Sequence, residues 1–145
     1  MSDPLYKREL LRLAANATGS GRLPDPCGTG TAHNPTCGDK VVVDIALEDG
    51  RILALAHHTM ACVLTQASAA VLGAYAAGMS RDEVETLHDA VRAMLEGGPL
   101  PHPPFDAYAV FDGVADHPQR HKCVLLPIDA VLEALAVSES GEAAG

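Results

Sequence analysis

Residues 34–56 read NPTCGDKVVVDIALEDGRILALA and contain two apolar runs joined by a charged turn. Residues 40–47 are rich in β-branched and apolar side chains, and residues 52–56 resume the apolar pattern after the turn. Asp49-Gly50 is a strong signal of a β-hairpin when it lies between two such runs. We therefore predict two antiparallel strands at the centre of the fold.

The segments around this hairpin favour helices. Small residues fill positions 62–77, which end at Gly78 and predict a buried helix. Ser80 and Glu83 form a capping-box signature for the next helix. In all, we predict helices over about residues 5–14, 62–77, 81–96 and 127–137, an element of unassigned type over 105–111, and a short strand near residues 30–33 within the loop-rich stretch 15–39. This order of elements is typical of an α+β domain.

Length and charge exclude several classes of protein. The chain has 145 residues, and we expect residues 1–145 to form a single domain with a disordered tail from about residue 138. The net charge of −9 has the opposite sign to that of a nucleic-acid binder. No apolar run reaches the roughly 18–20 residues of a membrane-spanning helix, and charges occupy the positions where a signal peptide is apolar. We therefore expect a cytoplasmic protein with reduced cysteines and no nucleic-acid or membrane partner.

Three cysteines and one aspartate give the chain its clearest chemistry. Cys37 lies just before the first strand of the hairpin, and Cys62 lies just after the second. Because a hairpin returns its ends to one edge, these two thiols can meet there, and Cys123 can join them from a third element. Asp39 can fold back toward Cys37 through the turn at Gly38. Such a set of ligands suits zinc, iron or an iron–sulfur cluster; the alternative is that the cysteines are scattered small residues of the core.

The chain resembles the iron–sulfur assembly scaffolds of the IscU/NifU N-terminal family in the strand pair and three short stretches: Asn34-Pro-Thr-Cys-Gly-Asp39, Ala61-Cys62 opening a small-residue helix, and Lys122-Cys123-Val-Leu-Leu126. The similarity runs from Tyr6 to Ala136. Residues 63–122 leave room for the extra segment of SufU proteins, and Lys122 stands where IscU proteins have histidine, so the SufU branch is favoured. The resemblance implies the SufE/IscU-like fold, in which a small three-stranded antiparallel sheet packs against several helices with the metal site at one end.

Two positions depart from the family pattern. Ala61 stands where the family usually has glycine before its second cysteine. The ring of Pro127 would clash with the carbonyl of Cys123 in a continuous helix. We therefore expect the last helix to start near Pro127, or Cys123 to lie in an irregular first turn.

The resemblance implies roles for individual residues. Cys37, Asp39, Cys62 and Cys123 would bind the metal, with the sulfurs roughly 3.5–4 Å apart as tetrahedral zinc requires, and the three cysteines would hold a cluster. Cys37 would also be the candidate sulfur acceptor.

Three neighbouring or unmatched residues have more open roles. Lys122 is a second candidate catalytic residue, because a cation beside thiolates lowers their pKa. His121, next to the site, is a candidate spare ligand or proton carrier. Cys27 lies outside the motif, and we expect it to be an incidental loop thiol.

Three functions remain open on these grounds. The first is a scaffold that accepts sulfur from a cysteine desulfurase, binds iron or a [2Fe–2S] cluster and passes the cluster to acceptor proteins. The second is a zinc-dependent sulfurtransferase of SufU type, which carries a persulfide. The third is a structural zinc module, against which the carboxylate at Asp39 argues, since structural zinc sites are normally closed by Cys and His.

Overall fold

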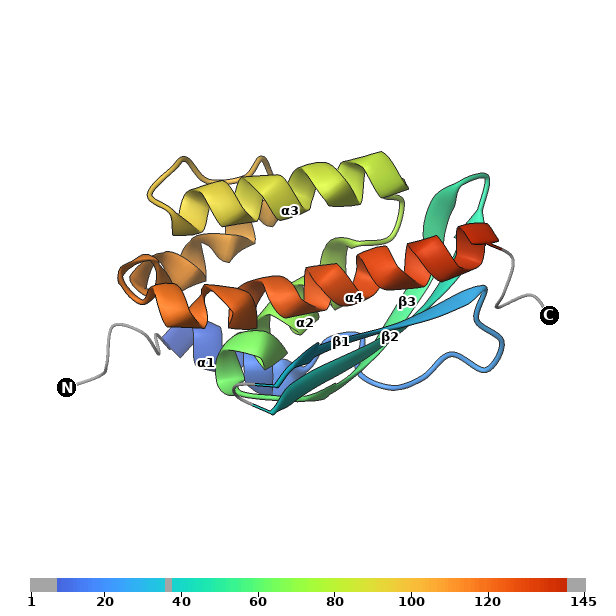
Figure 1. Cartoon of the computed structure of the whole chain (residues 1–145), viewed down its shortest axis with the longest axis horizontal. Coiled ribbons are helices and arrows are strands. Elements are labelled where there is room, and N and C mark those ends of the chain that lie inside the picture. The colour runs from blue at the N-terminus through green and yellow to red at the C-terminus, as the bar shows by residue number, and fades with distance from the viewer. Residues whose placement is uncertain (1–7, 36–37, 141–145) are drawn as a thin grey trace.

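The sheet is built on the expected hairpin (Figure 1). In this computed structural model, which describes residues 8–35 and 38–140, β2 (Asp39–Glu48) and β3 (Arg51–Met60) pair antiparallel across the turn at Asp49 and Gly50. The third strand, β1 (Gly28–Asn34), pairs antiparallel with the other side of β2, giving the order β1-β2-β3. The predicted α+β class with a three-stranded antiparallel sheet is confirmed. The strand predicted near residues 30–33 is longer than expected, since β1 spans Gly28–Asn34.

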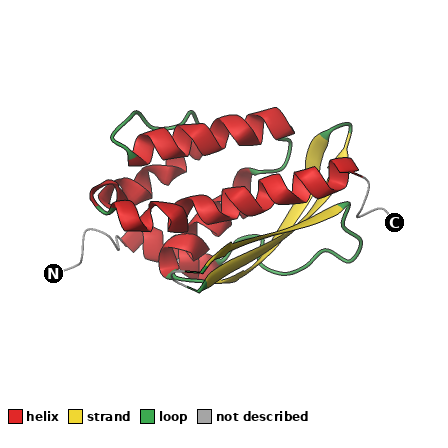
Figure 2. Ribbon diagram, in the orientation of Figure 1, coloured by secondary structure: helices red, strands yellow, loops and turns green. Residues whose placement is uncertain are grey.

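Helices account for most of the remaining described chain (Figure 2). The α-helices are α1 (Arg8–Asn16), α2 (Val63–Tyr75), α3 (Arg81–Leu95) and α4 (His121–Ser140), and two 3₁₀ helices, η1 (Phe105–Asp116) and η2 (Pro118–Arg120), precede α4. The capping box predicted at Ser80 and Glu83 is present, with each side chain binding the other residue's backbone N–H. The segment of unassigned type is η1.

The helices gather on one side of the sheet, and α4 lies across it against β1 and β2 (Figure 1). Helix α2 packs beside α4, α1 packs on α2, and α3 packs on α4. Alternate side chains of β2 enter the core between these layers, where Val41, Val43 and Ile45 are buried with Val71 of α2 and Val131 of α4. One layered core therefore fixes the start of α4 relative to the ends of the strands.

Helix α4 lies so close to β1 that the strand needs glycine. A Cβ atom at Gly30 would lie 2.9 Å from the Cα of Ala134 and closer still to the carbonyl oxygen of Ala130. The missing side chain lets the helix axis approach the sheet, because closely packed interiors leave no space for an added methyl group.

Asp44 anchors the opposite face of the sheet. Its buried carboxylate accepts hydrogen bonds from the Arg22 guanidinium at 2.6 and 3.1 Å, from the Thr29 hydroxyl at 2.7 Å and from the Leu23 N–H at 3.1 Å. Burial alone would raise the pKa of Asp44, but these donors outweigh it and hold the pKa below its ordinary value. The segment between α1 and β1 is thereby fastened to β2.

The expected start of the last helix near Pro127 is wrong. Helix α4 begins at His121 and contains Pro127 in its interior, so the alternative, Cys123 in the first turn, matches the structure. Proline lacks the N–H that would bind the carbonyl of Cys123 in a helix. The Thr65 hydroxyl of α2 donates to that carbonyl at 2.9 Å, and the Ser68 hydroxyl donates to the carbonyl of Val124 at 2.6 Å. The Thr65 hydroxyl thus replaces the donor that the proline removes, and Ser68 adds a second bond between α2 and α4.

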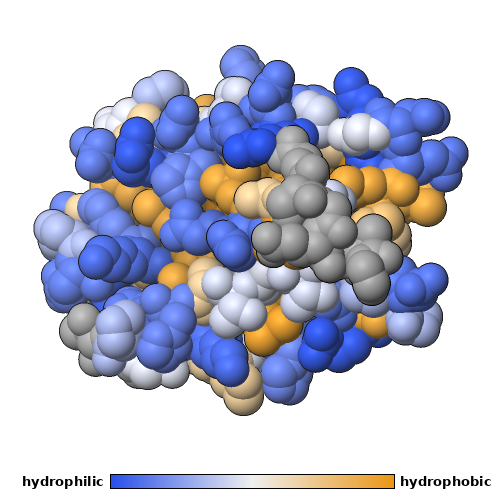
Figure 3. Space-filling model, turned by 45° about the vertical axis from the view of Figure 1, so that its right-hand side comes forward, coloured by the Kyte–Doolittle hydropathy of each residue, from blue (hydrophilic) through white to orange (hydrophobic). Residues whose placement is uncertain are grey.

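At its other end α4 continues through Ser140, beyond the expected start of the tail at residue 138. None of the helices within residues 8–35 and 38–140 has the length and hydropathy of a membrane span. The face shown in Figure 3 is largely hydrophilic, with hydrophobic side chains exposed in areas between the polar ones.

We expect Gly30→Ala to lower the free energy of unfolding by about 1–3 kcal/mol, because its methyl group would push against the backbone of α4. Urea denaturation followed by circular dichroism measures the loss. Thr31→Ser, at the exposed neighbouring position in the same strand, is the control and should change stability by no more than about 0.5 kcal/mol. Equal stability of Gly30→Ala and the wild type would show that α4 does not need this close approach.

Candidate metal centre

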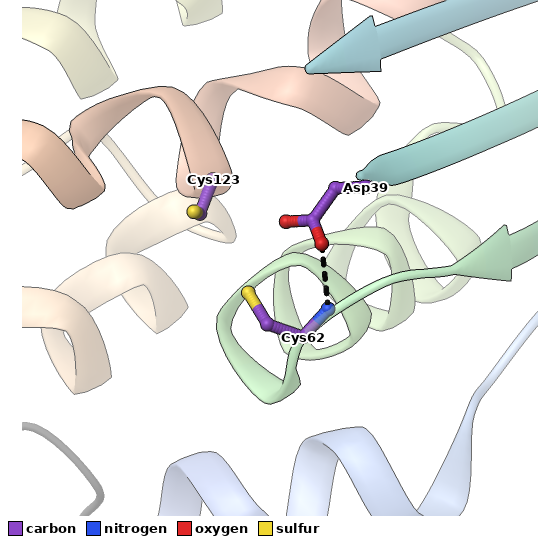
Figure 4. Close-up of side chains that lie close together, drawn as sticks. All are labelled: Asp39, Cys62 and Cys123. Atoms are coloured by element: carbon purple, nitrogen blue, oxygen red, sulfur yellow. Dashed lines mark hydrogen bonds between the residues drawn. The ribbon is translucent and has the colours of Figure 1, made fainter. Parts of the chain in front are cut away.

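Three of the four predicted site residues meet at one end of the sheet (Figure 4). Asp39 is the first residue of β2, Cys62 is the N-cap of α2, and Cys123 lies in the first turn of α4. One ligand atom from each lies within 4.8 Å of the others. Cys37, the fourth residue, lies outside the described residues.

The topology explains why this end of the sheet collects them. Asn34 pairs with Asp39 at the end of the β1–β2 ladder, and Lys40 pairs with Met60 at the end of the β2–β3 ladder. Directly before β2, Gly38 has a φ of +76°, and its N–H donates to the carbonyl of Asn34 at 2.8 Å. Glycine adopts this left-handed conformation without strain. The start of β2 and the end of β3 are therefore neighbours.

The carboxylate of Asp39 is buried and held by two donors. Its Oδ1 accepts the N–H of Cys62 at 3.2 Å, the bond drawn in Figure 4, and its Oδ2 accepts the Thr65 hydroxyl at 3.2 Å. Only 5% of the residue is exposed. A buried carboxylate in this setting needs compensating partners, and the two bonds supply part of that compensation.

The thiol of Cys62 is acidified by its surroundings. A hydrogen bond from the thiol of Cys123 is the largest cause, and bonds from the side chain and the backbone N–H of Thr65 add to it. Burial and the negative charge of Asp39 oppose the effect, and the balance lowers the pKa of Cys62 to about 6 from an ordinary 9.0. At neutral pH this sulfur is mainly a thiolate, the form that binds metals and attacks sulfur.

Cys123 reaches the cluster from inside the core. Its side chain is buried among apolar residues, and its position in α4 is fixed through the bond between its own carbonyl and Thr65. The site therefore combines two sulfurs and one carboxylate from three separate elements, with Asp39 and Cys123 buried and Cys62 partly exposed.

Comparison with known families identifies the domain to which these residues belong. The model of the family described as "NifU-like N terminal domain" matches residues 5–124. The chain belongs to this family. The family predicted from the sequence motifs is thus confirmed.

Individual NifU-like relatives cover nearly the whole chain. A crystal structure of the N-terminal part of a nitrogen-fixing NifU-like protein from Brucella abortus has a TM-score of 0.90 and 34% identity, over 95% of this chain and 96% of that one. The iron–sulfur cluster assembly scaffold protein IscU of Thermotoga maritima is 25% identical over 131 residues, which are 90% of this chain and 92% of the relative. A crystal structure described as that of a "putative iron-sulfur cluster assembly scaffold protein for SUF system" from Fervidobacterium islandicum shares the fold, with a TM-score of 0.82 and 21% identity over 93% of this chain and 99% of that chain.

The other candidate residues of this NifU-like domain lie outside the cluster. Cys27 precedes β1 at the opposite end of the sheet, where its sulfur accepts the N–H of Leu47 at 3.3 Å. The Nε2 atom of His121 bonds the carbonyl oxygens of Val114 and Ala115 at 3.1 and 3.3 Å, and so ties the start of α4 to η1. Lys122 is exposed, and the causes that acidify Cys62 are the neighbouring Cys123 and Thr65 instead.

Thr65 is the site residue that the sequence interpretation missed. Its hydroxyl lies within hydrogen-bond range of groups on all three ligand residues. A signal was available: Pro127 within a helix leaves a carbonyl in need of a donor, and hydroxyl residues spaced three apart at 65 and 68 are the donors in the apolar α2.

We expect alkylation of Cys62 in the metal-free protein to follow its thiolate, with a midpoint near pH 6. Iodoacetamide labelling across the pH range, with the modified peptides quantified by mass spectrometry, measures it. Cys123→Ala should move the midpoint upward, because it removes the strongest donor to the thiolate. Cys27→Ser is the control and should leave the midpoint in place. A wild-type midpoint near that of a free thiol would contradict the acidification.

Proposed function

We propose that this protein is an iron–sulfur cluster assembly scaffold that receives sulfur from a cysteine desulfurase and binds iron or a [2Fe–2S] cluster as its cargo. The observation that carries the proposal is the convergence of Asp39, Cys62 and Cys123 at one end of the sheet in a NifU-like domain. The relatives named as IscU scaffolds support it. We place the protein in the cytoplasm as one domain, with acceptor proteins of iron–sulfur clusters as its further partners.

The donor set fits this cargo. Thiolates are soft ligands that favour iron–sulfur clusters and zinc over magnesium or calcium. We assign Cys37 as the third thiolate, since it lies two positions before Asp39 in the sequence. Three thiolates and one carboxylate would complete a four-ligand site at this end of the sheet.

Asp39 is suited to be the exchangeable ligand. A carboxylate oxygen is a harder donor toward zinc or iron than a thiolate, so it is the easier of the ligands to displace. Its hydrogen bond with the N–H of Cys62 gives the displaced carboxylate a place to remain without disturbing β2. Release of Asp39 would open one coordination position for incoming sulfur or for transfer of the cluster.

The second candidate is a zinc-dependent sulfurtransferase of SufU type. It is favoured by Lys122 before the third cysteine, a feature of the SufU branch that the sequence resembles. In this reaction the thiolate of Cys37 attacks the terminal sulfur of the desulfurase's persulfide. A new S–S bond forms on Cys37 as the old one breaks, and the desulfurase leaves as a thiolate, so no external oxidant or reductant is consumed.

Metal and acid-labile sulfide in protein purified without oxygen separate the two candidates. For a scaffold, we expect iron and sulfide after incubation with Fe²⁺, cysteine, a cysteine desulfurase and a thiol reductant, which supplies the two electrons that convert persulfide sulfur into sulfide. Cys62→Ala should abolish both, whereas Cys27→Ser, at the far end of the sheet, should retain them. One zinc per chain and no sulfide under all these conditions would overturn the scaffold and support the sulfurtransferase.

Asp39→Ala tests the exchangeable ligand. For a scaffold, the variant should hold its cluster longer, because the three thiolates remain while the position that opens for transfer is lost. For a sulfurtransferase, it should bind zinc more weakly and accept sulfur more slowly. Cluster transfer to an apo-ferredoxin, sulfur transfer and metal content are compared for the variant and the wild type. If none of them changes, Asp39 is a turn residue without a role at the metal.

A further inference from the structure

The hydroxyl of Thr65 has more acceptors than it can serve. It lies 2.9 Å from the carbonyl oxygen of Cys123, 3.2 Å from Oδ2 of Asp39 and 3.5 Å from the sulfur of Cys62. A hydroxyl has one proton to donate. The three ligand residues therefore compete for a single donor that is itself fully buried.

Pro127 creates this competition. In an ordinary helix the N–H of residue 127 would bind the carbonyl of Cys123, and Thr65 would be free to donate to the carboxylate. Because proline has no N–H, the carbonyl of Cys123 accepts the Thr65 hydroxyl instead, at the shortest of the three distances. Asp39 therefore accepts the N–H of Cys62 and shares the Thr65 hydroxyl donor with the carbonyl of Cys123.

We propose that Thr65 is a positioning residue for Asp39, and that Pro127 determines how firmly Thr65 holds it. The hydroxyl of Thr65 orients the Asp39 carboxylate toward the site. Because the same hydroxyl also donates to the carbonyl of Cys123, its hydrogen bond to Asp39 is weakened and Asp39 stays exchangeable. This inference rests on the metal centre of the proposed function and concerns metal binding, so it does not depend on which of the two reactions the protein performs.

The test is Co²⁺ binding to the metal-free protein, followed by its thiolate-to-metal absorption bands and by competition with a chelator. Thr65→Val keeps the shape of the side chain and removes the hydroxyl. We expect its Co²⁺ affinity to fall by about 10–100-fold, the usual effect of removing a residue that orients a ligand. Thr65→Ser, which keeps the hydroxyl, should restore most of the affinity.

The double variant Thr65→Val/Pro127→Ala distinguishes a loss of stability in Thr65→Val from a loss of the hydrogen bond that positions Asp39. Alanine at position 127 supplies the missing N–H to the carbonyl of Cys123, so thermal stability should return to the wild-type level or above. Co²⁺ affinity should stay as low as in Thr65→Val, because Asp39 still lacks the hydroxyl. If the single variant does not fold, this double variant carries the comparison. Pro127→Ala alone should release Co²⁺ to the chelator more slowly than the wild type.

Two further variants locate the effect. Ser68→Ala also removes a hydroxyl bond from α2 to a carbonyl of α4, but Ser68 bonds Val124 and Tyr108 instead of Asp39. It should therefore lower stability without changing Co²⁺ affinity. In an Asp39→Ala background, Thr65→Val should have no additional effect on affinity, since residues that act through one another are not additive.

The outcomes are distinct. Unchanged Co²⁺ affinity in Thr65→Val, affinity recovered in the double variant, or a full additional loss in the Asp39→Ala background each overturns the positioning role while leaving the metal centre intact. Failure of the wild type to bind Co²⁺ or Zn²⁺ at all overturns the proposed function and this inference together.

Discussion

The hydrogen bond from the Thr65 hydroxyl to the carbonyl of Cys123 joins the two helices on which the site depends. Leaving such a buried carbonyl without a donor costs about 1–3 kcal/mol, and Pro127 removes its donor within α4. The Thr65 hydroxyl of α2 therefore stabilises the start of α4. This bond fixes the position of Cys123 relative to Cys62, three residues before Thr65 on the same helix. The spacing of the two sulfurs follows from backbone hydrogen bonding as much as from the thiols themselves.

The sheet supplies the other half of the site by ordinary strand geometry. β2 begins where β3 ends, so Asp39 and Cys62 lie close together although a whole hairpin separates them in the sequence. α4 can cross this sheet closely because Gly30 leaves room for the helix backbone. Without that approach, Cys123 would stand away from the strand ends. Features at the far side of the domain therefore control the distance between ligand atoms.

Local signals were enough to predict most of the fold. The Asp49-Gly50 turn and the Ser80–Glu83 capping box act within a few residues, and both are present. The start of α4 was mispredicted because Pro127 is unfavourable in a helix on local grounds alone. Its compensation comes from Thr65, a residue distant in the sequence, and only tertiary structure places the two together. The length of β1 was underestimated for a related reason: its glycines are typical of loops, but here they serve packing against α4.

Predicting the site required more than spacing. The hairpin predicted that Cys37 and Cys62 could meet and that Cys123 could join them from a third element, whereas the full set of ligands with Asp39 came from resemblance to a family. The role of Thr65 was missed, because its signal depends on Pro127 lying within a helix, and the local pattern placed Pro127 at the start of one.

The charges at the site favour a bound cation. Asp39 opposes ionisation of Cys62, while Cys123 and Thr65 favour it. A cation held between these groups would replace their mutual repulsion with attraction, and its binding would displace the remaining thiol protons. Binding of metal, release of protons and stability of this end of the domain are therefore expected to be coupled, because all three depend on the same few buried atoms.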